Sequence, residues 1–241
     1  MKSLAVVTGG TRGIGKSITE GLVRLGFDVY FTYKSREDLA LGIERLHPGS
    51  CKAFKFDHEN DDTNNFACRI LAERTPDILI NNIGMNHDEL FLNQDLSSFW
   101  KIIQFNFGST VACCKMFLES MIRKRKGHII NISSVAAIKP KVGNTAYGVS
   151  KAAIERFSKS LALEVARFNI RVNCVSPAYV KTDLLNAFLD GKKEREFYKA
   201  IPMRKVLLPE EVANIVVLLC SDQIRTTGSV FYVGNGENIV N

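Results

Sequence analysis

Short apolar runs and longer amphipathic segments alternate along the chain. The short runs are rich in valine, isoleucine and phenylalanine, a composition typical of buried strands. They predict strands at 4–8, 28–33, 51–56, 77–81, 128–133, 171–175 and 229–233. Between them, apolar residues recur at helical spacing, as in Ile14, Ile18, Leu22 and Leu25. This alternation predicts an α/β fold, with a parallel sheet of about seven strands and helices on both faces.

One domain accounts for the whole chain. The 241 residues are 46% hydrophobic and 24% charged, which is enough to bury a large core. We see no internal repeat, low-complexity stretch or linker, and therefore expect a single domain over 1–241. No apolar run approaches the ~20 residues that a membrane span needs, and the first residues do not resemble a secretory signal. We expect a cytoplasmic protein without a membrane partner.

Cysteine and histidine spacing gives no sign of a metal site or a disulfide framework. The six cysteines form no CxxC pair, and the four histidines form no HExxH motif. In a reducing compartment we expect the cysteines to be small hydrophobic residues of the core.

The net charge of +7 leaves several kinds of partner open. Basic residues are spread along the chain among acidic ones, and no nucleic-acid-binding module is visible, so we do not expect a nucleic-acid partner. The only dense run is Arg123-Lys124-Arg125-Lys126. It is either a solvated helix end or a docking site for an acidic partner.

A glycine-rich loop follows the first predicted strand and opens directly into a helix. Gly9 permits a sharp turn, Gly13 permits close approach of the backbone to a pyrophosphate, and Gly15 permits tight packing of the helix on the sheet. The free amides at the start of the helix attract an anion. We therefore predict a dinucleotide site, to which the loop also contributes Thr11, Arg12 and Ile14.

The second predicted strand ends without a carboxylate. A site specific for NAD needs an acidic side chain there, to accept a hydrogen bond from the 2′-hydroxyl of the ribose. This sequence has Tyr33, Lys34 and Ser35 instead. Lys34 and Arg12 could close on a 2′-phosphate, with Ser35 as a further donor, or both could be ordinary surface cations. The first interpretation predicts NADPH as the cofactor.

Tyr147 and Lys151 are four residues apart at the start of a periodic helix, so they share one face. An ammonium one turn away favours the phenolate, and we expect it to lower the pKa of Tyr147. The tyrosine can then donate a proton to a carbonyl oxygen as a hydride reaches the carbon, while Lys151 also holds the nicotinamide ribose. Ser134 follows a predicted strand and could bind the same carbonyl oxygen. The alternative is a surface pair of no chemical importance.

Taken together, these motifs resemble those of the single-domain short-chain dehydrogenase/reductases, over essentially the whole chain. The motifs in the family's order are the glycine-rich loop, Asn81-Asn82-Ile83-Gly84, Asn106, Ser134, Tyr147-x3-Lys151 and the segment from Ser176-Pro177 to Thr182. The resemblance implies a Rossmann-like doubly wound sheet, an oxidoreductase activity and a homotetramer. The four-residue spacing of Tyr147 and Lys151 does not match the enoyl-reductase branch, where the two are further apart.

The resemblance also implies roles for residues that the pattern alone does not single out. Asn106 would bend its helix and hold a water that links Lys151 to solvent. Asp57 and His58 would lie along the adenine of the cofactor. The remaining cofactor contacts would be Asn82, Ile83 and Gly84 at the adenosine ribose and behind the nicotinamide, and Pro177, Val180 and Thr182 beside the nicotinamide.

Two positions depart from the family's pattern. Ala178 replaces the glycine that usually follows the proline, which would alter the backbone beside the nicotinamide. Gly234-Asn235-Gly236 stands where the family usually has an aspartate and paired glycines, and this puts the details of tetramer packing in doubt.

Within the family, the resemblance is strongest to reductases that act on 3-oxoacyl groups carried by acyl-carrier protein, as in fatty-acid or related polyketide and polyene synthesis. In those enzymes a basic residue matching Arg125 docks the acidic carrier, and Arg167 could join it. The alternatives are an acetoacetyl-CoA reductase, a reductase of another small ketone or alcohol, and a non-catalytic nucleotide sensor. The segment 181–200, with an apolar face at Leu184, Leu185, Phe188 and Leu189, is a candidate lid over the substrate.

Overall fold

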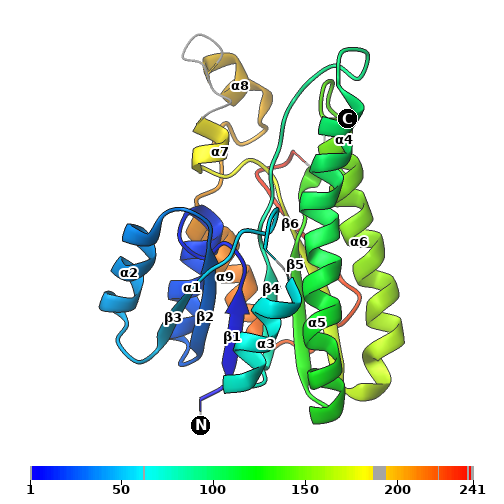
Figure 1. Cartoon of the computed structure of the whole chain (residues 1–241). Helices are drawn as coiled ribbons and strands as arrows, with labels where there is room; N and C mark the ends of the chain where they lie inside the picture. The colour runs from blue at the N-terminus through cyan, green and yellow to red at the C-terminus, as the bar shows by residue number, and fades with distance from the viewer. Residues whose placement is uncertain (1, 62, 187–193, 222, 238, 240–241) are drawn as a thin grey trace.

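The computed structural model of the chain describes all residues except 1, 62, 187–193, 222, 238 and 240–241 (Figure 1). In this part of the chain, one seven-stranded sheet has the order β3-β2-β1-β4-β5-β6-β7, and every neighbouring pair is parallel. The strands are β1 (Leu4–Val7), β2 (Asp28–Tyr33), β3 (Cys51–Lys55), β4 (Ile78–Asn81), β5 (Gly127–Ile132), β6 (Ile170–Pro177) and β7 (Val230–Val233). Each falls on a predicted run, and the predicted α/β, doubly wound parallel fold is confirmed.

Helices connect the strands and cover both faces of the sheet. They are α1 (Gly13–Arg24), α2 (Glu37–Leu46), α3 (Thr63–Glu73), α4 (Leu96–Ile103), α5 (Ser109–Lys124), α6 (Thr145–Val165), α7 (Asp183–Asn186), α8 (Glu194–Ala200) and α9 (Pro209–Cys220). Short turns complete the set: the π-turn η1 (Gln104–Gly108) and the 3₁₀ turns η2 (Val135–Ala137) and η3 (Ala166–Phe168).

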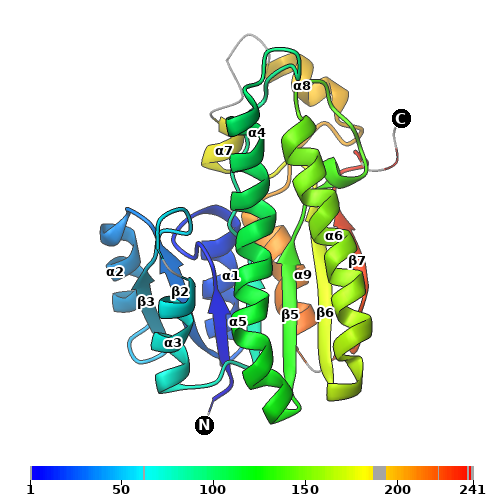
Figure 2. The same ribbon diagram turned by 45° about the vertical axis from the view of Figure 1, so that its right-hand side comes forward.

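Alternate strand residues supply two separate cores, one on each face of the sheet. Ala5 and Val7 of β1 pack with residues of α1, α2 and α9, whereas Val6 packs with residues of α3, α5 and α6. Figure 2 shows α5 and α6 in front of the sheet and α9 behind it. Because both faces are covered, the strands are apolar throughout rather than alternating, as their sequences indicate.

The strand order places a topological switch point between β1 and β4. From β1 the chain proceeds to β2 and β3 on one side, and β4 begins the run to β7 on the other. Ligands bind outside the carboxyl ends of the strands at such a point. The loops after β1, β4, β5 and β6 meet there, and α7 and α8 lie above this edge (Figure 1).

The cysteines are only partly the core residues that we expected. Cys113, Cys114, Cys174 and Cys220 are buried free thiols, and burial raises the pKa of both Cys113 and Cys174 to about 12. Cys68 is exposed, so the prediction is wrong for that residue. It lies on the solvent side of the amphipathic helix α3.

Among the described residues, no helix is long and apolar enough to cross a membrane. The described residues also contain no group of three or more histidine, cysteine or acidic side chains that could hold a metal ion.

Candidate active site

A cleft of about 420 Å³ opens at the carboxyl edge of the sheet. Its walls come from the segments that follow four strands: Ile14 after β1, Gly84 after β4, Ser134 after β5 and Pro177 at the end of β6. Tyr147 and Lys151 of α6 also line it. The structure therefore brings together the serine, tyrosine and lysine that sequence analysis selected.

Lys151 lies below Tyr147 on α6 and is almost fully buried, with 3% of the residue exposed. Its Nζ donates a hydrogen bond to the carbonyl oxygen of Ile132 at 2.9 Å and lies 5.6 Å from the centroid of the Tyr147 ring. Burial disfavours the charged form and lowers the pKa of Lys151 to about 8. This ammonium therefore loses its proton far more readily than one in water.

The pKa of Tyr147 is raised, because burial disfavours the phenolate. A hydrogen bond with Ser134 opposes the shift, and the nearby carboxylate of Asp88 adds to it. This corrects our expectation that Lys151 lowers the pKa of the phenol, because burial contributes most to the shift and Lys151 is not among the groups that cause it. The phenol is consequently protonated at neutral pH, which is the form needed for a proton donor.

Asn106 occupies the π-turn between α4 and α5 and is completely buried. Its Nδ2 donates to Ser150 Oγ at 2.9 Å, and its side chain also bonds the backbone of Met85. A π-turn inserts an extra residue into a helix, and such turns often mark functional sites. Asn106 thus connects the turn to the cleft wall after β4 and to α6.

The glycine-rich loop has the geometry of a phosphate cradle. Gly9 and Gly13 have positive φ values of 69° and 49°. A Cβ on Gly15 would lie 2.1 Å from the carbonyl oxygen of Gly9, so only glycine fits there. No side chain caps the start of α1 at Arg12, which leaves the first amides open to an anion. The loop fits the pyrophosphate of a dinucleotide.

The two cations predicted to bind a 2′-phosphate, one after β2 and one in the glycine-rich loop, already have acidic partners. Lys34 Nζ is ion-paired with Asp57 at 3.1 Å and also with Glu59, while Arg12 Nη1 lies 3.3 Å from Asp183. Tyr33 is buried and its hydroxyl donates to a glutamate of α2. Ser35 is exposed. Sequence analysis missed Glu59, which is distant from the glycine-rich loop along the chain.

Comparison with known proteins agrees with this arrangement. The family model described as "Enoyl-(Acyl carrier protein) reductase" matches residues 9–238. The 3-oxoacyl-[acyl-carrier-protein] reductase FabG of Aquifex aeolicus is 35% identical over 239 residues, which cover 97% of this chain and 96% of that protein. Carbonyl reductase family member 4 of Xenopus laevis is 32% identical over 240 residues, covering 98% of each.

A solved structure shows the same fold. The crystal structure of an oxidoreductase (short chain dehydrogenase/reductase family) from Burkholderia thailandensis superposes with a TM-score of 0.91 and 26% identity, covering 100% of this chain and 94% of that one. The chain belongs to the short-chain dehydrogenase/reductase family. It is therefore an oxidoreductase, as the motifs predicted.

The residues that the family resemblance placed at the adenine lie together after β3. Asp57 is held by Lys34 and by the amide of Glu59. His58 packs edge-on against Phe56, and both of its ring nitrogens are buried with no partner among the described residues. Burial lowers the pKa of His58 to about 4, so the ring is neutral. A neutral imidazole has one N–H donor and one acceptor nitrogen, so the ring can both donate and accept a hydrogen bond.

The Asn82-Ile83-Gly84 segment packs directly on the glycine-rich loop. The Nδ2 of Asn82 donates to the carbonyl oxygens of Thr8 and Gly9 at 3.0 and 3.2 Å, so this side chain fixes the loop. A Cβ on Gly84 would lie 3.3 Å from Lys151 Nζ, so a larger residue there would crowd the lysine.

The segment after β6 closes the cleft from the other side. Val180 forms an isolated parallel bridge with Leu207, and the methyl group of Thr182 lies against Gly13. Ala178 donates its amide to the carbonyl oxygen of Val233 at 2.8 Å. The alanine that departs from the family's pattern therefore still pairs in register with β7.

The candidate lid borders the cleft where the structure describes it. Leu185, Phe197 and Ala200 of this segment line the cleft. Phe188 and Leu189, which we predicted to complete the apolar face, lie outside the described residues, as does the side chain of Leu184. Closure of this segment remains a prediction.

Sequence analysis missed a polar cluster on the cleft wall. Asp88 accepts hydrogen bonds from Asn144 Nδ2 and Lys141 Nζ, both at 2.6 Å, and its charge raises the pKa of Tyr147. Glu237 also lines the cleft and is 3% exposed, and one of its carboxylate oxygens has no partner within the part of the chain that the structure describes. The only feature of the sequence that could have indicated this cluster is the position of Asp88 close to the Asn81-Asn82-Ile83-Gly84 motif.

The predicted docking residues lie away from the cleft. Arg125 and Arg167 are close together, since Arg125 Nη2 donates to the carbonyl oxygen of Arg167 at 3.1 Å. Arg125 directly precedes β5, and Arg167 precedes β6, so both lie at the amino edge of the sheet. Within one subunit, the sheet separates them from Ser134 and Tyr147.

Proposed function

We propose that this protein reduces a 3-oxoacyl thioester, carried by acyl-carrier protein, to the 3-hydroxyacyl product with NADPH. The observation that carries the proposal is the presence of Ser134, Tyr147 and Lys151 in one cleft, with the Nζ of the buried Lys151 5.6 Å from the centroid of the Tyr147 ring. The name of the Aquifex aeolicus relative supports the substrate class.

The side chains divide the proposed chemistry among them. When bound, the cofactor supplies a hydride to the carbonyl carbon. Ser134 binds the carbonyl oxygen, and Tyr147, protonated at neutral pH, donates the proton that this oxygen needs. Lys151 lies beneath the ring with a pKa of about 8, so it can resupply a proton to Tyr147 near neutrality.

NADPH is the proposed cofactor because Lys34 and Arg12 are cations at the end of β2 and at the glycine-rich loop. Both are exposed and paired with carboxylates, so a phosphate can exchange with those partners. If the acidic residues instead accept from the 2′-hydroxyl of a ribose, NADH is the cofactor. Measuring the affinity of the protein for NADPH and for NADH distinguishes these two possibilities.

The apolar residues of the cleft support an acyl substrate. Tyr179, Leu185, Phe197 and Ile201 provide a surface for an alkyl chain beside the catalytic groups. The Xenopus laevis relative is named a carbonyl reductase, which favours a small ketone as the second candidate. Enoyl reduction, which the description of the family model names, is disfavoured by the four-residue spacing of Tyr147 and Lys151.

We propose a homotetramer, by analogy with the family. Because Arg125 and Arg167 lie at the edge opposite the cleft, they can dock a carrier productively only if another subunit brings its own cleft to that edge. Docking at these residues is therefore part of the proposal only for the assembled protein.

The decisive experiment is steady-state oxidation of NADPH with four substrates: 3-oxoacyl-carrier protein, acetoacetyl-CoA, crotonyl-CoA and a simple ketone. We expect the highest kcat/KM with the carrier-linked 3-oxoacyl group and no oxidation with crotonyl-CoA. Equal kcat/KM for the carrier-linked substrate and acetoacetyl-CoA would remove the carrier from the proposal. Activity with the simple ketone alone would establish the second candidate.

A further inference from the structure

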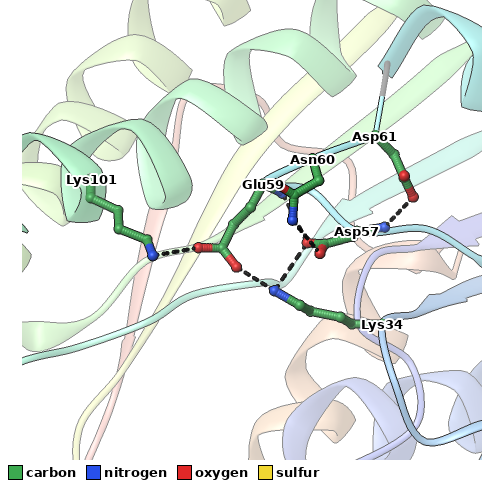
Figure 3. Close-up of polar contacts among 6 residues, drawn as sticks. All are labelled: Lys34, Asp57, Glu59, Asn60, Asp61 and Lys101. Atoms are coloured by element: carbon green, nitrogen blue, oxygen red, sulfur yellow. Dashed lines mark hydrogen bonds and ion pairs between the residues drawn. The ribbon is translucent and has the colours of Figure 1, made fainter.

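Glu59, in the loop after β3, lies between two lysines from different elements (Figure 3). Its Oε2 is ion-paired with the Nζ of Lys34, which directly follows β2. Its Oε1 lies 3.0 Å from the Nζ of Lys101, which belongs to α4. Each carboxylate oxygen therefore has its own cation, and one side chain connects the adenosine end of the site to α4.

Asp57 gives Lys34 a second carboxylate, at 3.1 Å. The amide of Glu59 and the Nδ2 of Asn60 donate to Asp57 at 3.0 and 2.8 Å, which fixes its position (Figure 3). The hydrogen bonds from Lys34 and then Lys101 lower the pKa of Glu59, and the hydrogen bond to Glu59 contributes most to raising the pKa of Lys34. The pKa of Asp57 is lowered as well, so Lys34, Asp57 and Glu59 are all charged at neutral pH.

This arrangement bears on the cofactor because Lys34 occupies the position that distinguishes a 2′-phosphate from a 2′-hydroxyl. The Lys34 side chain is 52% exposed, whereas that of Glu59 is only 21% exposed. The lysine is therefore accessible to an incoming anion, but its charge already has a partner within the protein.

We infer that Glu59 weakens the preference for NADPH by competing with the 2′-phosphate of the dinucleotide for Lys34. The inference rests on the proposed use of NADPH. A phosphate carries more charge and more acceptor oxygens than a carboxylate, so it displaces Glu59 from Lys34 but binds less tightly than it would to a lysine without a partner. Glu59 thus reduces the preference for NADPH over NADH.

Lys101 favours this exchange. When the phosphate takes Lys34, Glu59 keeps its ion pair with Lys101, so the displaced carboxylate retains a partner. Without Lys101, the whole charge of Glu59 would remain with Lys34 and oppose the phosphate more strongly. Glu59 and Lys101 therefore affect phosphate binding in opposite directions.

The test is calorimetric titration of the full chain with adenosine 2′,5′-bisphosphate and with AMP, which lacks the 2′-phosphate. Glu59→Gln is expected to tighten the bisphosphate about fivefold, the size of an exposed ion-pair effect, and to leave AMP unchanged. Lys101→Gln is expected to weaken the bisphosphate about twofold. Glu119→Gln is the matched control, because it removes the same charge from the far end of α5, where Glu119 pairs only with Arg123 among the interactions described.

The outcomes separate this inference from the function on which it depends. If the wild-type protein binds the bisphosphate no better than AMP, the proposed use of NADPH fails, and the inference fails with it. If the wild-type protein prefers the bisphosphate but Glu59→Gln leaves its affinity unchanged or weakens it, the inference is overturned and the use of NADPH stands. Equal tightening by Glu59→Gln and Glu119→Gln would also overturn it, because the effect would then be one of net charge.

Discussion

Asn106 binds both polar groups of the Met85 backbone: its Oδ1 accepts from the amide at 2.8 Å and its Nδ2 donates to the carbonyl oxygen at 3.0 Å. The two residues are 21 positions apart, one in the π-turn and one in the segment after β4. The amide of a single buried side chain thus fixes the wall of the cleft beside Gly84, where a Cβ would lie 3.3 Å from Lys151 Nζ.

Replacement of this side chain tests its structural contribution. Asn106→Ala removes three hydrogen bonds and takes the side-chain partner from both partly buried backbone groups of Met85, so we expect a loss of about 2–4 kcal/mol in the free energy of unfolding. Urea denaturation measures it. Asn93→Ala, in an exposed loop, is the control, and equal stability of the two variants would contradict the role of Asn106.

Two glycine-to-alanine substitutions should have opposite effects. Gly15→Ala places a Cβ 2.1 Å from the carbonyl oxygen of Gly9, so the loop must shift; we expect reduced stability and loss of dinucleotide binding. Gly42→Ala, on α2, meets no atom within 4 Å and should stabilise the protein by about 0.5–1 kcal/mol. Thermal unfolding with and without NADPH checks both predictions. If NADPH raised the Tm of Gly15→Ala as much as that of the wild-type protein, the glycine-rich loop would not be the phosphate cradle.

The pKa of Lys151 predicts how stability depends on pH. Its pKa is 10.5 in the unfolded chain and about 8 in the folded protein, so between these values the unfolded state binds more protons. The contribution of Lys151 to the free energy of unfolding should therefore increase from pH 8 to pH 10.5, by about 1 kcal/mol per pH unit. Urea denaturation of the wild-type protein and Lys151→Met at several pH values isolates this contribution. A constant difference between the two proteins would show that Lys151 is not desolvated.

Removal of the cations near the end of β2 tests the choice of cofactor. Lys34→Ala combined with Arg12→Ala should weaken NADPH about tenfold or more and change the affinity for NADH far less, because only NADPH has a 2′-phosphate. Fluorescence titration with each cofactor measures the two affinities. Lys16→Ala, on the exposed side of α1, is the control for a general loss of charge, and equal weakening of both cofactors by the double variant would contradict the proposal.

The sequence was sufficient to predict the sheet because each strand is a continuous apolar run between helical patterns. It was also sufficient to select Ser134, Tyr147 and Lys151, since residues that follow parallel strands gather at one edge. The same rule places Arg125 at the edge of the sheet opposite the cleft, because that residue precedes β5 rather than following it.

Other features could not be derived from the sequence because they depend on long-range packing. The ion pair of Lys34 with Glu59 joins two loops, and the bond of Lys151 to Ile132 exists only because α6 packs on β5. The raised pKa of Tyr147 has the same origin: sequence spacing gives the distance to the lysine, whereas burial depends on the complete fold.

The proposed reduction requires Tyr147 as the proton donor in the cleft. Its most direct test measures, in Tyr147→Phe, both the affinity for NADPH and the rate of NADPH oxidation with the best substrate of the wild-type protein. We predict an affinity within about twofold of wild type, since only a hydroxyl is lost, and a rate at least about a hundredfold lower. Oxidation at the wild-type rate with intact cofactor binding would contradict the account.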